Sequence, residues 1–222
     1  MTKPLSRALL IAAFGLAAGI TQAAIIITTG GTTAPGHGQT TSVAGATITT
    51  FDNAGQRGCS SAASFGYGGS GTVRSGSTSG VSATPAGDSS CYLTIARNQS
   101  SSASYGSAQD YFGLYWGSID SYNTISFFNG SDLVGAFGGA AVPGSGPFGN
   151  WTSTSDNQYV NFWFTGSSLF DRVVLTSGNN AFESDNHAVA RVPEPATLGL
   201  LGLGLLGVAA ARRRRRGAAA RA

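Results

Sequence analysis

Three carboxylates stand apart from the other acidic residues by their place in the sequence. Glu183 and Asp185 are two residues apart within the expected strand 181–189, and Asp52 directly follows the expected strand 46–51. Alternate residues of a strand share a face, so Glu183 and Asp185 are expected side by side. Asp52 joins them if the first and last strands are neighbours, as they commonly are in jelly-roll sandwiches. Clustered carboxylates repel one another unless a hard, oxygen-seeking cation lies between them, so we predict a structural Ca²⁺ site at Asp52, Glu183 and Asp185, with a solvated sheet face as the alternative.

Other reaction chemistries find less support in the sequence. Nine acids between residues 24 and 192 allow a paired-carboxylate glycoside hydrolysis, but most of them lie in turn-like segments that Asp favours for structural reasons. The chain has two histidines, His37 and His187, no G-x-S-x-G elbow, and lysine only at Lys3. We therefore predict a non-enzymatic protein with no catalytic cofactor. A secreted glycan-active hydrolase that uses Asp or Glu residues is the alternative.

Aromatic residues are the second group that can recognise a ligand. They are concentrated in short runs such as 111–116 and 161–164, where period-two alternation places rings on both faces of a strand. One face must build the core, and exposed rings are platforms on which a sugar can stack. We predict carbohydrate contacts at Trp151, which lies in a turn-like segment, and at Tyr115; burial of these rings in the core is the alternative.

Two cysteines frame the most unusual stretch of the chain. Cys59 and Cys91 bracket residues 60–90, which consist almost wholly of Ser, Gly, Ala and Thr. A protein that leaves the cytoplasm and has two cysteines is expected to pair them. We predict a Cys59–Cys91 disulfide around a stretch that is either a flexible excursion or a set of weak edge strands.

The remaining central sequence indicates strands rather than helices. Between residues 24 and 192 there is no lysine, no methionine and one glutamate, so strong helix formers are scarce. Runs of aromatic and β-branched residues alternate with Gly, Ser, Asn and Asp, and Asn129-Gly130 is typical of a tight hairpin turn. We predict an all-β domain over 24–191, a jelly-roll-like antiparallel β-sandwich, with strands at 25–29, 46–51, 91–96, 111–116, 123–128, 133–137, 158–164, 172–176 and 181–189.

The N-terminal segment is typical of a secretory signal peptide. Two basic residues precede the apolar run 8–20, and Thr21-Gln22-Ala23 places small residues at the positions that a signal peptidase requires. We predict a signal helix over 1–23 with cleavage after Ala23. A short buried helix or an uncleaved anchor is the alternative.

The C-terminal segment contains three features in a fixed order. Pro193-Glu194-Pro195 precedes sixteen uncharged residues at 196–211, and these precede five arginines, Arg212, Arg213, Arg214, Arg215 and Arg216. Sixteen helical residues extend about 24 Å, which is marginal against about 30 Å of hydrocarbon, so we predict a short transmembrane helix over 196–211 with the arginines on its cytoplasmic side. The segment 192–222 resembles the PEP-CTERM protein-sorting signal of Gram-negative bacteria. That resemblance implies recognition and cleavage by an exosortase, and delivery of the preceding domain to the cell surface or the extracellular space.

The distribution of charge narrows the choice of partners. The formal net charge is +3, but the segment 24–192 has five arginines and nine carboxylates and carries −4. The basic residues thus belong to the two ends, and no nucleic-acid partner is expected. The amino-acid sequence around 111–130 and 182–189 also resembles uncharacterised exported domains that often precede this sorting signal, and that resemblance implies a jelly-roll-like sandwich. We predict an exported protein, transiently anchored in the inner membrane, that associates with exopolysaccharide.

Overall fold

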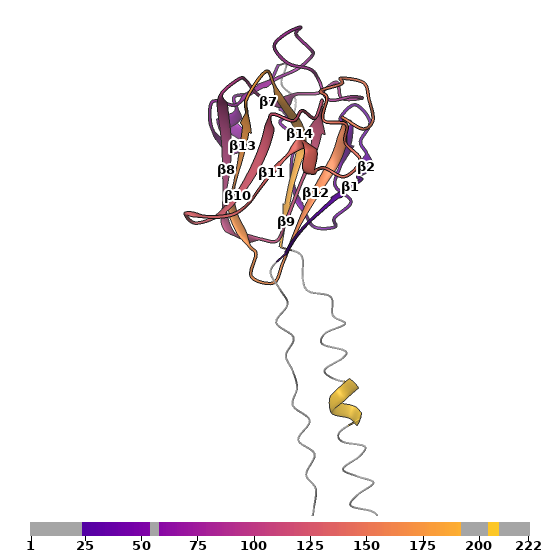
Figure 1. The fold of residues 1–222 in the computed structure, drawn as a ribbon, viewed down its shortest axis with the longest axis vertical. Coiled ribbons are helices and arrows are strands. Elements are labelled where there is room, and N and C mark those ends of the chain that lie inside the picture. The colour runs from indigo at the N-terminus through magenta and orange to yellow at the C-terminus, as the bar shows by residue number, and fades with distance from the viewer. Residues whose placement is uncertain (1–23, 54–57, 192–203, 209–222) are drawn as a thin grey trace, which may run out of the picture.

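Two antiparallel sheets pack against each other to form the body of the molecule (Figure 1). The computed structural model describes residues 24–53, 58–191 and 204–208. The first sheet contains, in spatial order, β1 (Ala24–Thr29), β12 (Gln158–Thr165), β9 (Tyr111–Gly117), β14 (Phe182–Ala190), β7 (Tyr92–Ile95) and β6 (Thr72–Arg74), with β4 (Thr47–Thr49) also paired to β14. The second contains β11 (Asp132–Gly138), β10 (Asn123–Asn129), β13 (Phe170–Ser177), β8 (Gln99–Gln109) and β5 (Tyr67–Gly69). The predicted all-β antiparallel sandwich is confirmed.

Short elements complete the described chain. The strands β2 (Thr32–Thr33) and β3 (Gln39–Thr40) form a small hairpin of their own. Two 3₁₀ turns, η1 (Ala62–Phe65) and η2 (Gly139–Ala141), connect strands. No helix in the described ranges is long and apolar enough to cross a membrane, and residues 204–208 form one short helical segment.

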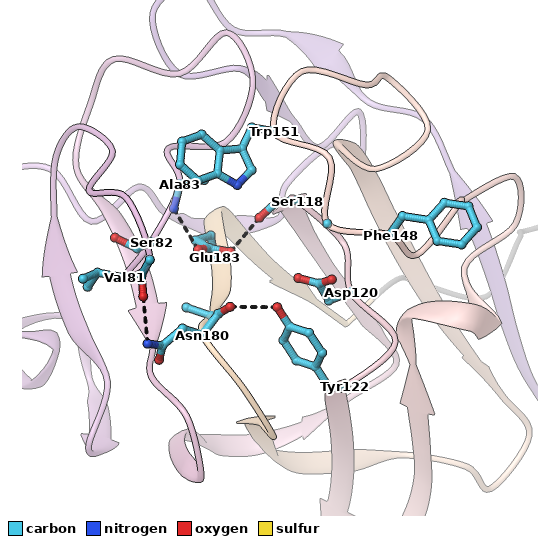
Figure 2. Close-up of a pocket in the computed structure, with 13 residues that line it drawn as sticks. Val81, Ser82, Ala83, Ser118, Asp120, Tyr122, Phe148, Trp151, Asn180 and Glu183 are labelled. Atoms are coloured by element: carbon cyan, nitrogen blue, oxygen red, sulfur yellow. Dashed lines mark hydrogen bonds between the residues drawn. The ribbon is translucent and has the colours of Figure 1, made fainter.

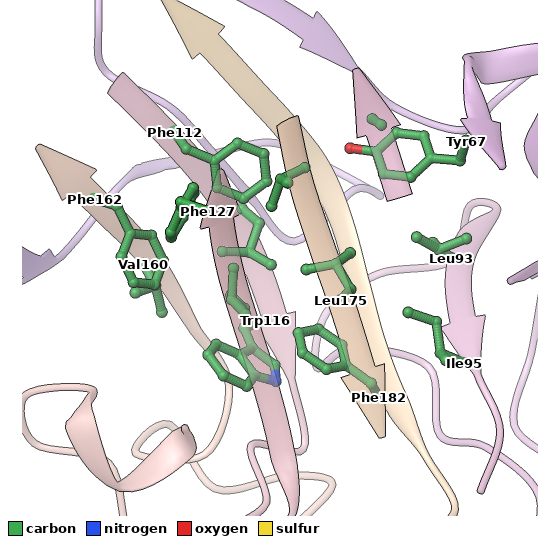
Figure 3. Packing of buried hydrophobic residues seen from close by; sticks show 14 of the residues in the cluster. Tyr67, Leu93, Ile95, Phe112, Trp116, Phe127, Val160, Phe162, Leu175 and Phe182 are labelled. Carbon is green, nitrogen blue, oxygen red and sulfur yellow. The ribbon is translucent and has the colours of Figure 1, made fainter. Parts of the chain in front are cut away.

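Aromatic rings fill the space between the sheets (Figure 3). Phe127 of β10 lies 5.6 Å from Phe112 of β9 and 5.1 Å from Phe162 of β12, measured between ring centroids. Trp116 stacks on Phe182 at 4.7 Å. Each such ring stabilises the fold by about 1.5–3 kcal/mol through removal of apolar surface from water. This core fixes β9, β12 and β14 relative to one another, and these strands lead into the loops discussed below.

Each of the nine predicted strands corresponds to one in the structure, whereas β8 and the two short strands β2 and β3 were not predicted. Residues 60–90 were predicted to be either a flexible excursion or weak edge strands, and the second alternative is correct. In that stretch β5 is the edge strand of the second sheet and β6 is the edge strand of the first. The hairpin between β10 and β11 is also confirmed, with Asn129 paired to Asp132 and a positive φ of 59° at Gly130.

The predicted disulfide is present between Cys59 and Cys91. Their Cα atoms are 5.8 Å apart and 32 residues separate them in sequence. The backbone N–H of Cys91 donates to Asp52 Oδ1 at 2.9 Å, so the bridge is joined to the segment that follows β4. The bond closes the chain around both edge strands.

The domain begins and ends at the same pole of the sandwich. The register pairs Ala24 with Thr165, Trp163 with Tyr111, and Tyr111 with Ala190. Trp163 pairs in turn with Ile26, so the last residue of β14 is in one row with Ile26, two residues from the first residue of β1, and Figure 1 shows the two ends of the domain converging there. We call this end the stalk pole. The predicted signal peptide 1–23 with its cleavage after Ala23, and the sorting residues of 192–222 other than 204–208, lie outside the described residues.

Candidate functional site

A pocket of about 180 Å³ opens at the end of the sandwich opposite the stalk pole (Figure 2). Its walls come from four segments, 80–83, 118–122, 148–151 and 180–183. Ser118 follows the last residue of β9, and Glu183 is the second residue of β14, where it pairs with Gly117. The strand termini therefore set the floor of the pocket, and the loops set its rim. We call it the distal pocket.

Glu183 forms the floor of the distal pocket and is 2% exposed. Its Oε1 accepts a hydrogen bond from the backbone N–H of Ala83 at 2.8 Å, and its Oε2 accepts one from the Ser118 hydroxyl at 2.7 Å. Burial raises the pKa of Glu183 to about 7, and the nearby negative charge of Asp120 acts in the same direction. The two hydrogen bonds oppose this shift because they favour the charged form.

Asp120 and Tyr122 line the opposite wall. Burial raises the pKa of Asp120, and the charge of Asp156 adds to the effect. The Tyr122 hydroxyl donates to the backbone oxygen of Asn180 at 2.7 Å, which joins this wall to the residues before β14. Gly149 packs directly on the Asp120 carboxylate with a φ of +68°, a place and a conformation that a larger residue does not tolerate.

Two aromatic side chains project from the rim. Trp151 is 46% exposed and Phe148 is 87% exposed. Their loop is held from below by Asp156, which is buried and accepts hydrogen bonds from the backbone N–H groups of Gly146 and Asn150, each at 3.0 Å. The rings are thus presented on a fixed loop, and Trp151, predicted as a carbohydrate contact, is exposed there.

Tyr115 does not belong to this surface, and its prediction as a carbohydrate contact is wrong. The residue is 2% exposed, and its hydroxyl donates to the backbone oxygen of Ala86 at 2.5 Å. The ring also packs on the backbone at Gly38. Tyr115 faces away from the sandwich core, but loops from elsewhere in the chain cover that outer face.

The three carboxylates predicted to share a calcium ion are not arranged as a metal site. Glu183 and Asp185 do lie on one face of β14, but Glu183 is occupied by Ala83 and Ser118. Asp52 Oδ2 lies 3.1 Å from His37 Nδ1 instead. Within residues 24–53, 58–191 and 204–208, no group of three or more His, Cys, Asp or Glu side chains is placed to hold a metal ion. The calcium prediction for Asp52, Glu183 and Asp185 is therefore corrected.

His187 lies between the sheets rather than on the surface. Its Nδ1 is 2.5 Å from the Tyr67 hydroxyl and its Nε2 is 2.8 Å from Ser184 Oγ. Burial lowers its pKa to about 3, so the ring is neutral at ordinary pH. A second cavity of about 230 Å³ adjoins it, but Ser184 is fully buried and has no access for a substrate.

Burial also determines how stability depends on pH. Asp185 is fully buried against Asp88, so desolvation and the charge of Asp88 raise the pKa of Asp185. Between the pKa values of the unfolded and the folded state, the folded protein therefore keeps protons on Asp185 and Glu183 that the unfolded chain has lost. The stability that these two groups contribute is complete below the unfolded pKa values and is lost as the pH rises through the folded pKa values. His187 has the opposite effect, but only below about pH 6.5, where the unfolded chain gains a proton there.

We expect the thermal midpoint of the mature protein to fall as the pH is raised from about 6.5 to about 9. Asp185→Asn removes the buried carboxyl group with the largest pKa shift, so the thermal midpoint of this variant is expected to decline much less with pH. Differential scanning calorimetry across the pH series measures both. A midpoint that is constant or rises over this interval contradicts the assignment of buried, protonated carboxyl groups.

Residues 191–216 match the model of the PEP-CTERM protein-sorting motif. The chain carries a PEP-CTERM sorting motif. The match includes Pro193-Glu194-Pro195 and all five clustered arginines, and it begins at the residue after β14 ends. The motif implies an exported protein that transits the membrane and is processed by an exosortase. No curated protein and no solved structure matches the chain.

Several residues of the distal pocket were not predicted from the sequence. Asp120, Tyr122 and Phe148 lie in turn-like segments whose composition is the same as that of many surface turns. Glu183 was predicted as a metal ligand, and it lines the pocket instead. A cluster formed by four separate loops leaves no spacing pattern in the sequence, so no sequence motif was available to identify it.

Proposed function

We propose that this PEP-CTERM protein is a non-enzymatic component of the cell surface or extracellular matrix that binds exopolysaccharide through the distal pocket. Exposed Trp151 and Phe148 beside buried hydrogen-bonding groups are the observation that carries this proposal. A sugar ring has apolar C–H faces and polar hydroxyl edges. The aromatic rings of Trp151 and Phe148 match the faces, while Glu183, Asp120 and Asn180 offer acceptors to the hydroxyl groups.

The mode of delivery supports the same proposal. Sorting to the envelope by an exosortase places the domain among surface polymers. The pocket lies on a rigid sandwich and its rim loop is anchored by Asp156, so little order has to be gained on binding. The short span of the pocket is suited to one or two sugar units of a longer chain.

Glycan hydrolysis is the second candidate function. A carboxyl group with a pKa of about 7 in a pocket is typical of a general acid, and Asp120 lines the same pocket. However, both oxygens of Glu183 accept hydrogen bonds from the protein, which holds the group as an acceptor rather than as a proton donor to a ligand. Release of reducing ends by the wild-type protein, and its loss in Glu183→Gln, identifies a hydrolase and contradicts the non-enzymatic proposal.

Trp151→Ala is expected to weaken binding of exopolysaccharide at least tenfold, because tryptophans at the centre of a binding site commonly contribute more than about 2 kcal/mol. Co-sedimentation of the mature protein with exopolysaccharide purified from the producing organism measures the loss. Leu133→Ala is the matched control, since Leu133 is exposed on the β10–β11 hairpin and does not line the pocket.

Unchanged binding by Trp151→Ala, or an equal loss in Leu133→Ala, shows that the distal pocket is not the binding site. Absence of binding by the wild-type protein contradicts the proposed function itself. Thermal midpoints of the variants confirm that each is folded, which is expected because both side chains project into solvent.

A further inference from the structure

The distal pocket is anionic and contains no opposing charge of its own. Its ionisable carboxylates are Glu183 and Asp120, and none of the described residues that line it is a lysine or an arginine. Two neighbouring cations, Arg74 and Arg97, contact residues at or beside the pocket wall without lining the pocket themselves. Arg74 Nη1 lies 3.5 Å from Ser82 Oγ, and Arg97 Nε donates to Asn179 at 2.8 Å.

Holding negative charge in this partly desolvated pocket thus destabilises the folded protein. Glu183 receives hydrogen bonds from two neutral donors, and Asp120 is half-buried with Asp156 nearby. A buried charge that lacks an opposite charge is costly, and an incoming cation offsets that cost. An incoming anion increases it. The pocket therefore discriminates against uronic acids, sulfated sugars and phosphorylated sugars.

The rim adds a second preference for positive charge. An indole ring attracts an ammonium group positioned over its face, by about 0.5–2 kcal/mol depending on how far the pair is desolvated. Trp151 overhangs the cavity that contains Glu183, as Figure 2 shows. A ligand that combines a sugar ring with a cationic substituent can therefore stack on Trp151 and place its charge toward Glu183 and Asp120.

We propose that the ligand of the distal pocket is a glycan with free amino sugars, whose ammonium group lies between Trp151 and the carboxylates of Glu183 and Asp120. This inference rests on the proposed function and specifies its ligand class. The formal charge of −4 on the segment 24–192 supports it, because long-range attraction also favours a cationic polymer over an acidic one.

Three oligosaccharides of equal length test the proposal by isothermal titration calorimetry with the mature protein at about pH 8, where Glu183 is ionised. The first is a glucosamine oligomer whose amines carry permanent quaternary charge, the second is its N-acetylated counterpart, and the third is a galacturonate oligomer. We expect the quaternised oligomer to bind about tenfold or more tightly than the N-acetylated one. We expect the galacturonate oligomer to bind most weakly.

Charge-neutral variants locate the effect. Glu183→Gln and Asp120→Asn are each expected to reduce the preference for the cationic oligomer over the N-acetylated one several-fold. Asp132→Asn is the matched control, because it removes the same charge from an exposed position outside the pocket. Asp120 is only half-buried, so its variant remains informative if Glu183→Gln does not fold.

Equal or tighter binding of the N-acetylated or galacturonate oligomer overturns the inference but leaves carbohydrate binding intact. The same holds if Asp132→Asn reduces the preference as much as Asp120→Asn. Failure of all three oligomers and of exopolysaccharide to bind contradicts the proposed function instead. The two failures are therefore distinguishable.

Discussion

Replacement of Pro193, Glu194 and Pro195 by alanine is expected to abolish release of the domain and to leave the full-length protein in the membrane fraction. The PEP-CTERM motif implies cleavage by an exosortase, and these residues are the defining part of the matched segment. The match begins at Arg191, the residue after β14 ends, so the substituted positions lie beyond the strands of the described domain. Folding is therefore expected to be unaffected while processing is lost.

Immunoblots of membrane, surface and medium fractions measure this effect, and mass spectrometry of the released form gives its C-terminus. Arg221→Ala is the matched control, since Arg221 lies in the tail but beyond the matched segment, and it is expected to be released normally. Release of the triple variant at the wild-type level contradicts the role assigned to the motif.

Removal of the disulfide by Cys59→Ser with Cys91→Ser is expected to destabilise the domain by about 3.7 kcal/mol in the chain-entropy model, because the bond closes a loop with a sequence separation of 32 residues. For a domain of this size that corresponds to a fall of roughly 10 °C in thermal midpoint. The double variant avoids the odd thiol that a single substitution leaves.

Reduction of the wild-type protein serves as an independent route to the same state. We expect reduced wild type and the double variant to share one midpoint, and the double variant to be insensitive to reductant. A double variant as stable as the oxidised wild type shows that the bond adds nothing to stability. Oxidised and reduced samples of the wild type with equal midpoints lead to the same conclusion.

The strands could be predicted where the residue types themselves indicate that the side chains are buried. The runs around Phe112, Phe127 and Phe162 are rich in aromatic and β-branched residues, and all three rings are in the core. β8 was missed because it is built almost wholly from Ser, Ala and Gln, with Tyr105 as its single large ring. Its place in the sheet is set by backbone pairing to β13 and β5, which leaves little trace in residue type.

Coverage by distant loops explains the errors at the site. Alternation correctly places Tyr115 and Asp185 on the outer face of the first sheet, but the segments around Gly38 and Ser90 cover that face. Outward-facing residues were therefore buried rather than exposed. The shared face of Glu183 and Asp185 was correctly predicted. However, Glu183 accepts a hydrogen bond from Ala83 and Asp185 accepts one from Ser90, so their proximity in sequence did not produce a metal site among the described residues.

The position of the stalk pole determines how the molecule is displayed. β14 runs nine residues from Phe182 beside the distal pocket to Ala190 at the stalk pole, a length of about 26 Å. In the membrane-anchored state that we propose, the distal pocket is therefore at the end of the domain farther from residue 191, after which the sorting motif continues. On the proposed function, a polymer chain can bind before the sorting motif is cleaved, so binding and release are independent in time. Cleavage would then liberate a preassembled protein–glycan particle as readily as an empty protein.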